Sequence, residues 1–374
     1  MGTPMTAVSP SVRFTLPAPT GNERVGTMSL HLIDRSRADP WVPDQPIRQL
    51  MIQIWYPAAT IRGYPQAPWM TPATARAYEQ VARLPVFNWP TTAGHRGAPV
   101  KRRQGGWPVL LYSHGLGGPR TEATALVADL ASHGYIVVTI DHTHDSLVVE
   151  FPDGHLEHSA TPELTDDNEL EVTTKSVNAR VADTRFVLDQ LIEINRGHNA
   201  EHRPLPRGLP GAFDLAHVGM LGHSDGGSTT AAVLHDDSRL AAGINLDGTL
   251  WTPSAIAGSD RPLLLLGRDE QDRGRDASWA TFWTNHRGPK LQLKLTGAAH
   301  NAFLDFAMLL PQAAPILGIP PNQVVKAAGA INGQRAAAVV RAYVNAYFDC
   351  YLRHRHTPLL DGPSPHYTEV QFTS

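Results

Sequence analysis

The sequence is poor in cysteine, because Cys350 is the only one among its 374 residues. A single thiol forms no intrachain disulfide and cannot supply a metal site that is built from several cysteines. Cys350 falls in a helical pattern with no basic residue placed to ionise it. We therefore interpret it as unreactive.

The sequence also lacks an excess of charge and a long apolar run. Its 32 lysines and arginines nearly balance 35 aspartates and glutamates and form no cluster, so nucleic acid is not an expected partner. No apolar stretch approaches the roughly 20 residues of a membrane-spanning helix. Residues 1–21 lack the cationic start and apolar core of a signal peptide, which predicts a cytoplasmic protein unless a leader has been removed.

Short apolar runs alternate with longer amphipathic ones along most of the chain. Runs typical of strands buried on both faces occupy residues 107–115, 135–142, 216–224, 241–248, 262–270 and 291–300. Helical patterns lie at 121–134, 178–194 and 333–354, and the last is expected to cover one face of a sheet. Residues 28–34 and 48–58 are typical of antiparallel edge strands. The pattern predicts an α/β fold with a mostly parallel sheet and helices on both faces.

Three segments interrupt this alternation, at about 59–105, 143–177 and 302–331. The first is rich in proline, glycine and aromatic residues, the second is polar and acidic, and the third is apolar. None is both long and of low complexity, so we interpret them as loop or lid insertions on a single domain spanning 1–374. The apolar segment 306–319 is compatible with a lipid-facing lip, which would allow contact with a lipid surface, or with ordinary buried packing.

Residues 222–227 read GHSDGG, directly after a predicted buried strand and before a predicted helix. The G-x-S-x-G pattern is weak by itself, but a strand, a sharp turn and a helix are the setting of a nucleophile elbow. Glycines on both sides of Ser224 would relieve crowding where strand and helix nearly touch. The alternative is that Ser224 merely caps the helix.

A nucleophilic serine needs a base and an acid that orients the base. His300 follows the last predicted parallel strand, where a loop can reach back over the elbow. His223 is too close in sequence to fold back onto Ser224, and we interpret it as packing at the elbow. Asp247 and Asp269 each end a later strand, and position alone does not choose between them.

An oxyanion hole needs two backbone N–H groups, one after the serine and one from the loop after residues 107–113. We expect these donors to be Asp225 and Leu116, in a loop where Gly115, Gly117 and Gly118 permit close approach of substrate. The loop does not complete a phosphate-binding motif. His114 either lines the site or is structural.

These residues and their surroundings resemble the lipoprotein-associated and bacterial platelet-activating-factor acetylhydrolases, a family of α/β-hydrolases. The similar stretches are residues 16–21, 25–34, 50–58, 111–142, 219–227, 243–251 and 297–306. Bacterial cutinases and polyester hydrolases are similar at a greater distance. The resemblance implies that Ser224 is the nucleophile, His300 the base and Asp247 the acid. The cutinases place the acid at the level of Asp269.

The expected acyl-enzyme mechanism needs no cofactor and no metal, and Gly115, His114, His223 and Trp251 are our candidates for residues near the substrate. One residue departs from the family pattern: Asp225 stands where relatives have an apolar side chain. Because a carboxylate near a developing oxyanion opposes it, we expect this side chain to turn away and to be tied to an amide or a cation.

Residues 141–145 read DHTHD, and an H-x-H pair can bind zinc. No third cluster of ligands is evident, so we expect a pocket wall or a helix cap there instead of a metal site.

The sequence thus predicts a serine hydrolase of carboxylic esters that acts on a small-molecule or lipid ester through an acyl-enzyme. The alternatives are an acyltransferase or cyclase with the same three residues, a polyester or cutin hydrolase, and a binding protein that kept the fold. Product analysis separates the first alternative, and labelling by a fluorophosphonate separates the last. The sequence indicates no oligomeric state.

Overall fold

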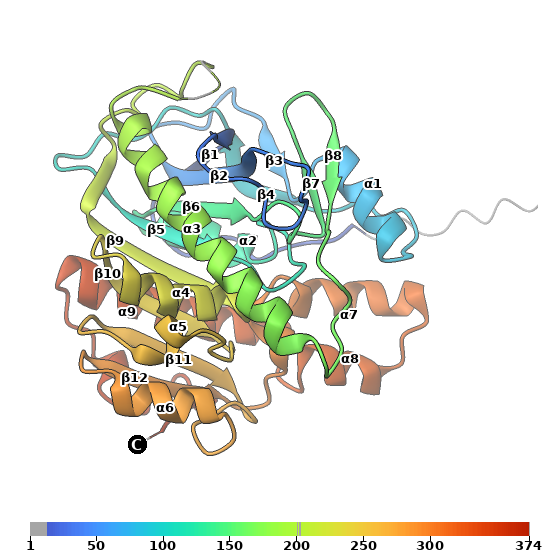
Figure 1. Ribbon diagram of the computed structural model, residues 1–374, viewed down its shortest axis with the longest axis vertical. Coiled ribbons are helices and arrows are strands. Elements are labelled where there is room, and N and C mark those ends of the chain that lie inside the picture. Colours follow the sequence, from blue (N-terminus) through green and yellow to red (C-terminus); the bar gives the residue numbers. More distant parts are fainter. Residues whose placement is uncertain (1–12, 200, 202, 374) are drawn as a thin grey trace, which may run out of the picture.

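One sheet of eleven strands organises the part of the chain that the computed structural model describes, residues 13–199, 201 and 203–373. Its order is β13-β12-β11-β10-β9-β5-β6-β2-β1-β4-β3 (Figure 1). The six strands from β12 to β6 in this order pair in parallel. They are β5 (Trp107–Ser113), β6 (Ile136–Asp141), β9 (Phe213–His223), β10 (Leu240–Leu246), β11 (Leu263–Arg268) and β12 (Lys290–Leu295). The predicted mostly parallel sheet is confirmed.

The two early strands are antiparallel but do not form the edge, so that prediction was wrong. β2 (Arg48–Ala58) pairs antiparallel with β6 and with β1 (Arg24–Asp34). The chain after β2 then returns to cover β1, because β4 (Thr91–Arg96) pairs parallel with it and β3 (Gln66–Pro68) lies outside β4. At the opposite edge, the unpredicted strand β13 (Val370–Phe372) is antiparallel to β12.

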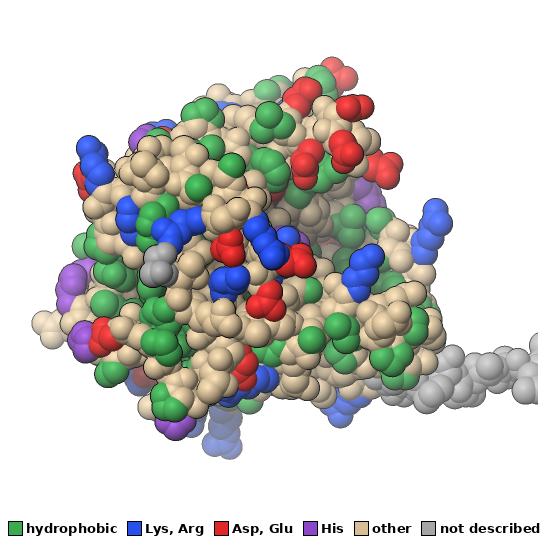
Figure 2. Space-filling view, turned by 90° about the horizontal axis from the view of Figure 1, so that it is seen from below, with side chains coloured by type: hydrophobic (Ala, Val, Ile, Leu, Met, Phe, Trp, Pro, Cys, Tyr) green, Lys and Arg blue, Asp and Glu red, His purple; other side chains and the backbone are tan. Residues whose placement is uncertain are grey.

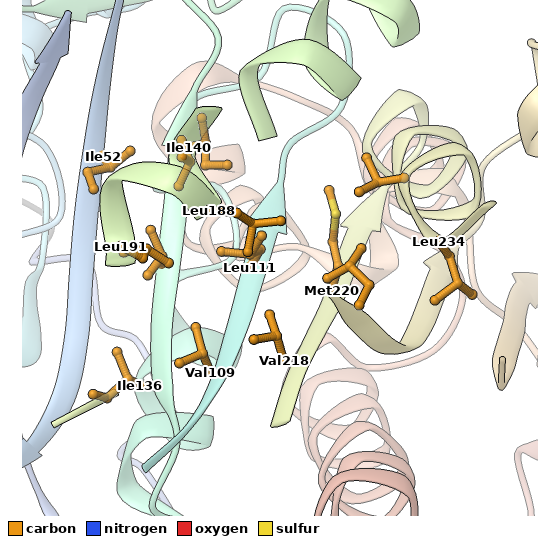
Figure 3. Close-up of a cluster of buried hydrophobic side chains, with 14 of the residues drawn as sticks. Ile52, Val109, Leu111, Ile136, Ile140, Leu188, Leu191, Val218, Met220 and Leu234 are labelled. Atoms are coloured by element: carbon orange, nitrogen blue, oxygen red, sulfur yellow. The ribbon is translucent and has the colours of Figure 1, made fainter. Parts of the chain in front are cut away.

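Helices cover both faces of the sheet (Figure 1). One face carries α3 (Glu169–Asn195), α4 (Asp225–Asp236), α5 (Pro253–Ala257) and α6 (Ala277–Asn285). The other face carries α2 (Thr124–Ser132) and α9 (Gly333–Arg353). Figure 3 shows Leu188 and Leu191 of α3 against strand side chains such as Leu111 and Val109. Each fully buried leucine of this kind contributes about 1.5–3 kcal/mol through the hydrophobic effect.

The helix α3 begins nine residues earlier than the sequence pattern indicated, so it takes up the end of the expected insertion 143–177. The first turns of α3, which the sequence pattern did not indicate, bury Val172, Thr173 and Ser176. This burial stabilises the helix in that segment. The rest of that insertion holds a hairpin of β7 (Val148–Glu150) and β8 (Leu156–His158).

The other two insertions are also structured. The first holds α1 (Pro72–Val81) and the strands β3 and β4, and the third holds α7 (Phe306–Leu317) and α8 (Pro321–Ala328). Two 3-10 turns, η1 (His300–Phe303) and η2 (Pro358–Leu360), complete the elements. Leu309 and Ala313 of α7 pack with Phe14 and Trp69 in a small separate core. Of the two alternatives for residues 306–319, a lipid-facing lip or buried packing, buried packing therefore describes the inner face of α7.

None of the helices among the described residues is long and apolar enough to cross a bilayer. On the face in Figure 2, lysine and arginine side chains lie singly among acidic and hydrophobic ones, and acidic side chains gather at one corner. Most of residues 1–21, where the absence of a leader was inferred, lie outside the described residues.

Candidate active site

Ser224 occupies a strained turn between β9 and α4. Its backbone has φ 55° and ψ −121°, a conformation that costs a non-glycine residue about 1–3 kcal/mol. Its side chain makes no capping hydrogen bond to α4, which removes the support for the helix-cap alternative. A Cβ at Gly222 would lie 2.2 Å from the backbone of Gly226, and one at Gly226 would lie 2.0 Å from Ser113 O. Glycine is therefore the side chain that fits on either side of the serine.

His300 and Asp247 are brought together from 53 positions apart. Nδ1 of His300 lies 2.6 Å from Oδ2 of Asp247, and Oδ1 of Asp247 accepts the backbone N–H of Arg268 at 2.8 Å. Because a carboxylate only accepts hydrogen bonds, the proton of the neutral imidazole sits on Nδ1, and Nε2 is left as the basic nitrogen. His300 and Ser224 line the same cavity.

Asp269, the other candidate acid, has a different partner. Its Oδ2 accepts the Gly297 N–H at 2.7 Å, in the loop that leads to His300. The geometry thus favours Asp247 as the acid, as the family resemblance implies.

His223 contacts the backbone and the ring of His300. Its Nε2 lies 2.8 Å from the backbone oxygen of His300, and the two rings are 4.4 Å apart. Burial lowers the pKa of His223 well below its usual value, with a further contribution from the neighbouring His300. His223 is therefore neutral and donates to His300 O, so it packs at the elbow as expected and also lines the cavity.

The loop after β5 forms a tight turn beside the elbow. The Gly118 N–H donates to Gly115 O at 2.9 Å, and Gly117 has φ 70°, which identifies a turn that needs glycine at its third position. A Cβ on Gly115 would lie 3.4 Å from Ser224 Cβ, so loop and elbow are in contact. The N–H groups of Leu116 and Asp225 donate to no acceptor among the described residues, which leaves both available to an oxyanion.

A cavity of about 510 Å³ opens beside Ser224. Its walls come mainly from the insertions and from the N-terminal segment, and they are mostly apolar. The aromatic lining residues are Phe14, Trp69, Tyr78, Phe87, Trp89 and Phe306. The aliphatic ones include Leu84, Leu116, Leu147, Leu164, Leu304, Leu309, Leu310 and Leu317. The aromatic content of 59–105 is evident in the sequence, but no local pattern assigns these side chains to the site.

Two residues expected near the substrate do not line this cavity, and both expectations are corrected. His114 is fully buried, with Nδ1 2.6 Å from Gly115 O and Nε2 2.7 Å from Ser146 Oγ. Trp251 packs against the core on the α3 side of the sheet, and its backbone N–H donates to Ser228 Oγ at 2.9 Å. Gly115 and His223 do line the cavity.

The DHTHD segment contributes to a network of buried polar groups. Each of its four charged or titratable side chains has a different main partner: Asp141 with Arg120, His142 with Asp183, His144 with Asp39, and Asp145 with Arg180. Within the described residues, no group of three or more His, Cys, Asp or Glu side chains is arranged to hold a metal ion.

Removal of metals should leave ester hydrolysis unchanged. The contacts of His142 with Asp183 and of His144 with Asp39 occupy the side chains that a zinc ion would need. The measurement is the rate of p-nitrophenyl acetate hydrolysis before and after prolonged dialysis against EDTA, with a dialysed sample without EDTA as control. Loss of activity that zinc restores would contradict this expectation.

The side chain of Asp225 turns away from the cavity and is buried. Its Oδ2 has no hydrogen-bond partner among the described residues, but the side chains of Ser176 and Trp251 hydrogen-bond to the carboxyl group and the Arg180 charge lies near it. Arg180 itself pairs with Asp145, so the expected tie to a cation is an interaction at a distance and not a direct ion pair. Burial raises the pKa of Asp225 to about 6, although the Arg180 charge opposes this. Between pH 4 and 6 the folded protein thus binds more protons than the unfolded chain, and stability falls as pH rises.

Asp225→Asn should therefore raise the melting temperature more at pH 8 than at pH 5, since it removes a buried charge present only at the higher pH. Because the side chain faces away from the cavity, kcat for a neutral short-chain ester should change by less than about tenfold. Thermal unfolding at the two pH values and initial rates measure these effects. Asp166→Asn, at an exposed position, is the control and should show no difference between pH values. A larger change in kcat would mean that the carboxylate acts on the site.

Comparisons with known proteins identify the family of this chain. The profile of the family described as "Platelet-activating factor acetylhydrolase, isoform II" matches residues 14–344. The chain belongs to this family. The expected family and the esterase class of its relatives are confirmed.

Two curated relatives and one solved structure are similar to this chain. A protein of Arthroderma benhamiae named "Probable 1-alkyl-2-acetylglycerophosphocholine esterase" is 30% identical over 71% of this chain and 66% of its own length. The canine platelet-activating factor acetylhydrolase is 31% identical over 58% of this chain and 52% of its own. The chain thus spans about two thirds and one half of these relatives.

The structure of a ferulic acid esterase from Streptomyces cinnamoneus matches with a TM-score of 0.81 and 33% identity. The match covers 97% of this chain and 100% of that one. The α/β-hydrolase fold expected from the sequence is confirmed.

Proposed function

We propose that this protein hydrolyses carboxylic esters through an acyl-enzyme on Ser224. The observation that carries the proposal is the 2.6 Å contact between His300 Nδ1 and Asp247 Oδ2, in a loop that shares one cavity with the strained Ser224. An orienting acid, a base and a serine on an elbow together are the arrangement that activates a hydroxyl.

The reaction follows from this arrangement. Ser224 Oγ attacks the ester carbonyl carbon while Nε2 of His300 takes its proton, and the Leu116 and Asp225 N–H groups bind the oxyanion. The intermediate collapses as His300 returns the proton to the leaving alcohol. Water, activated by the same nitrogen, then attacks the acyl-enzyme and releases the acid. Asp247 remains ionised and stabilises the imidazolium at each step.

The cavity favours an ester with a neutral, apolar portion. Trp69 and Trp89 lie with ring centroids 5.2 Å apart, and Phe14 stacks on Trp89 at 5.4 Å. These faces suit a planar aromatic acid or a compact alkyl group, and dispersion and hydrophobic burial supply the binding energy. The match to a ferulic acid esterase covers nearly the whole of both chains and therefore favours an ester with an aromatic acyl group. A phospholipid ester is the second candidate.

The test of the proposal combines labelling with a substrate series. A fluorophosphonate should label the wild-type protein at Ser224, located by peptide mass spectrometry. p-Nitrophenyl esters from acetyl to palmitoyl, methyl ferulate and a 2-acetyl phospholipid then define the acyl preference. No labelling and no turnover of any ester would refute hydrolysis. Transfer of the acyl group to an added alcohol in preference to water would indicate the acyltransferase alternative.

A further inference from the structure

The carbonyl of Gly115 is held by three donors. It accepts the Gly118 N–H at 2.9 Å and Arg180 Nη2 at 3.2 Å, and His114 Nδ1 lies 2.6 Å from it. The Gly115 N–H, in turn, donates to Oε1 of Glu122 at 2.9 Å. Both backbone groups of this glycine are therefore fixed, in a loop whose neighbouring Leu116 N–H is free.

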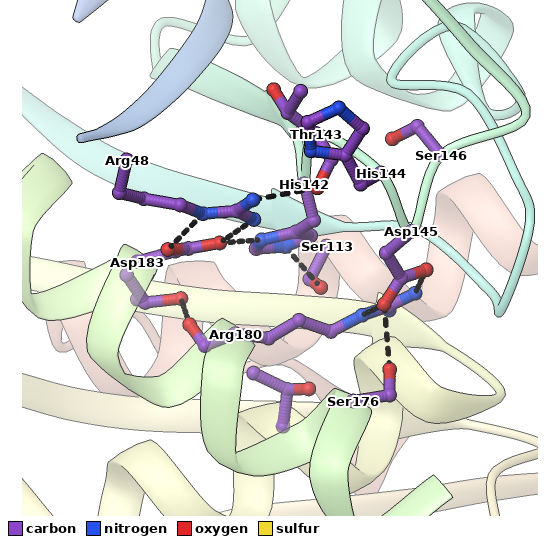
Figure 4. A network of polar contacts seen from close by, with 12 residues as sticks. Arg48, Ser113, His142, Thr143, His144, Asp145, Ser146, Ser176, Arg180 and Asp183 are labelled. Atoms are coloured by element: carbon purple, nitrogen blue, oxygen red, sulfur yellow. Dashed lines mark hydrogen bonds and ion pairs between the residues drawn. The ribbon is translucent and has the colours of Figure 1, made fainter. Parts of the chain in front are cut away.

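Arg180 reaches this loop from the middle of α3, and it is fully buried. Nη2 lies 2.5 Å from Oδ1 of Asp145, Nε lies 2.8 Å from Oδ2, and Nη1 donates to the carbonyl of His114. Ser176 Oγ donates to the same carboxylate at 2.6 Å. Figure 4 shows Arg180 extended from α3 toward Asp145, and a dashed line joins Ser176 to the same carboxylate. One guanidinium thus joins a buried carboxylate to two consecutive carbonyls of the loop.

The histidine beside Arg180 is neutral with its proton on Nδ1. Burial, and next the charge of Arg180, lower the pKa of His114 well below its usual value. Its Nε2 faces the hydroxyl of Ser146 at 2.7 Å and the His142 N–H at 3.3 Å, so it acts as an acceptor. Nδ1–H is consequently the donor to Gly115 O.

Geometry links this carbonyl to the oxyanion hole. In a planar trans peptide, the C=O of one residue and the N–H of the next point in opposite directions. Donors that hold Gly115 O on the buried side therefore aim the Leu116 N–H toward the cavity, where Ser224 lies against Gly115. We propose that the buried Arg180–Asp145 pair is the positioning element of the oxyanion hole. This assignment rests on the proposed function of Ser224.

A neutral donor alone would hold the peptide less firmly. Hydrogen bonds from an ionised donor are roughly twice as strong as neutral ones, and the guanidinium is a rigid fork. Asp145 fixes that fork by two contacts, so the carbonyl meets a donor that cannot rotate. An oxyanion donor contributes to catalysis only while it is aimed at the place where charge develops. If the Leu116 N–H no longer points at that place, kcat should fall while ground-state binding of the substrate stays nearly intact.

The test is Arg180→Lys, which keeps the charge opposite Asp145. A single ammonium on a shorter side chain cannot span the carboxylate and both carbonyls. We expect kcat to fall about 10- to 100-fold, with KM changed less than about threefold. The affinity for a trifluoromethyl ketone, whose serine adduct places an oxyanion in the hole, should fall by the same factor as kcat/KM.

The matched control is Arg48→Lys. Arg48 is equally buried and paired with Asp183 and Asp39, and Figure 4 shows it beside Asp183. The backbone carbonyl that it contacts is that of Thr143, not one of residues 114–118. Both variants should lose stability in thermal unfolding, and only Arg180→Lys should lose kcat and adduct affinity. Equal effects of the two variants on kcat and on the adduct would overturn the proposal.

A second variant covers the case in which Arg180→Lys does not fold. Arg180→Met combined with Asp145→Asn removes both charges of the pair, so neither partner is left behind as an unpaired charge. It should show the same loss of kcat and of ketone affinity, and wild-type values for both would refute the proposal. Labelling of the wild-type protein by a fluorophosphonate is measured in parallel. Absence of that labelling would show that the proposed function itself, and not the positioning role, is wrong.

Discussion

Ser224→Ala should lower kcat for a p-nitrophenyl ester by at least about 10³-fold while the protein stays folded. The hydroxyl is the group that forms the acyl-enzyme, and the residual rate would come from the oxyanion donors and the binding cavity. The fold should persist because the Ser224 side chain makes no capping bond to α4, and its strained backbone is imposed by the close approach of strand and helix. Burst kinetics, circular dichroism and thermal unfolding measure both parts.

Ser228→Ala provides the matched control for this variant. Ser228 lies one helical turn further along α4, is fully buried, and accepts the backbone N–H of Trp251 instead of facing the cavity. Its loss should affect stability and leave kcat within about threefold of wild type. If Ser224→Ala kept activity within tenfold of wild type, Ser224 would not be the nucleophile.

The parts of the fold and site that local sequence could predict are those fixed by local chemistry. The parallel strands from β5 to β12 are continuous apolar runs, and burial on both faces requires that pattern. Ser224 could be found because glycines on both sides are needed where β9 meets α4. His300 followed from its place after the last parallel strand.

The parts that sequence could not predict depend on pairing over long distances. Asp247 and Asp269 both end strands, and the register that sets one against His300 appears only in three dimensions. The placement of β4 outside β1 depends on the return of a long loop, which has no periodic signal. His114 stands beside the oxyanion loop in sequence, yet its ring turns toward Ser146 because buried partners there satisfy both nitrogens.

The polar network behind the oxyanion loop was missed for a related reason. Arg180 has the spacing of an ordinary helix residue, and nothing local indicates that it is buried. Its partner Asp145 belongs to the DHTHD segment, which was weighed as a metal site. A buried ion pair depends on both partners, which here lie far apart in the sequence. Neither residue alone therefore indicates in the sequence that it is buried and paired.

Asp247→Asn should lower kcat about 10²- to 10⁴-fold with little change in KM. An amide can donate to Nδ1 of His300 and so favours the tautomer in which Nε2 carries the proton and cannot act as a base. The structure adds a second cost. The Arg268 guanidinium pairs with Asp247 and lies 3.4 Å from His300 Nδ1. Without the carboxylate, its charge would oppose the imidazolium that forms in the transition state.

Asp269→Asn is the matched comparison, since it makes the same chemical change one strand later. Asp269 holds the Gly297 N–H and does not contact His300, so the variant should lose less than about tenfold in kcat. Rates of acylation from pre-steady-state measurements, with thermal unfolding of both variants, separate chemistry from stability. A larger loss for Asp269→Asn than for Asp247→Asn would reverse the assignment of the acid. It would place this chain with the cutinase arrangement, in which His300 turns toward the end of β11 during the reaction.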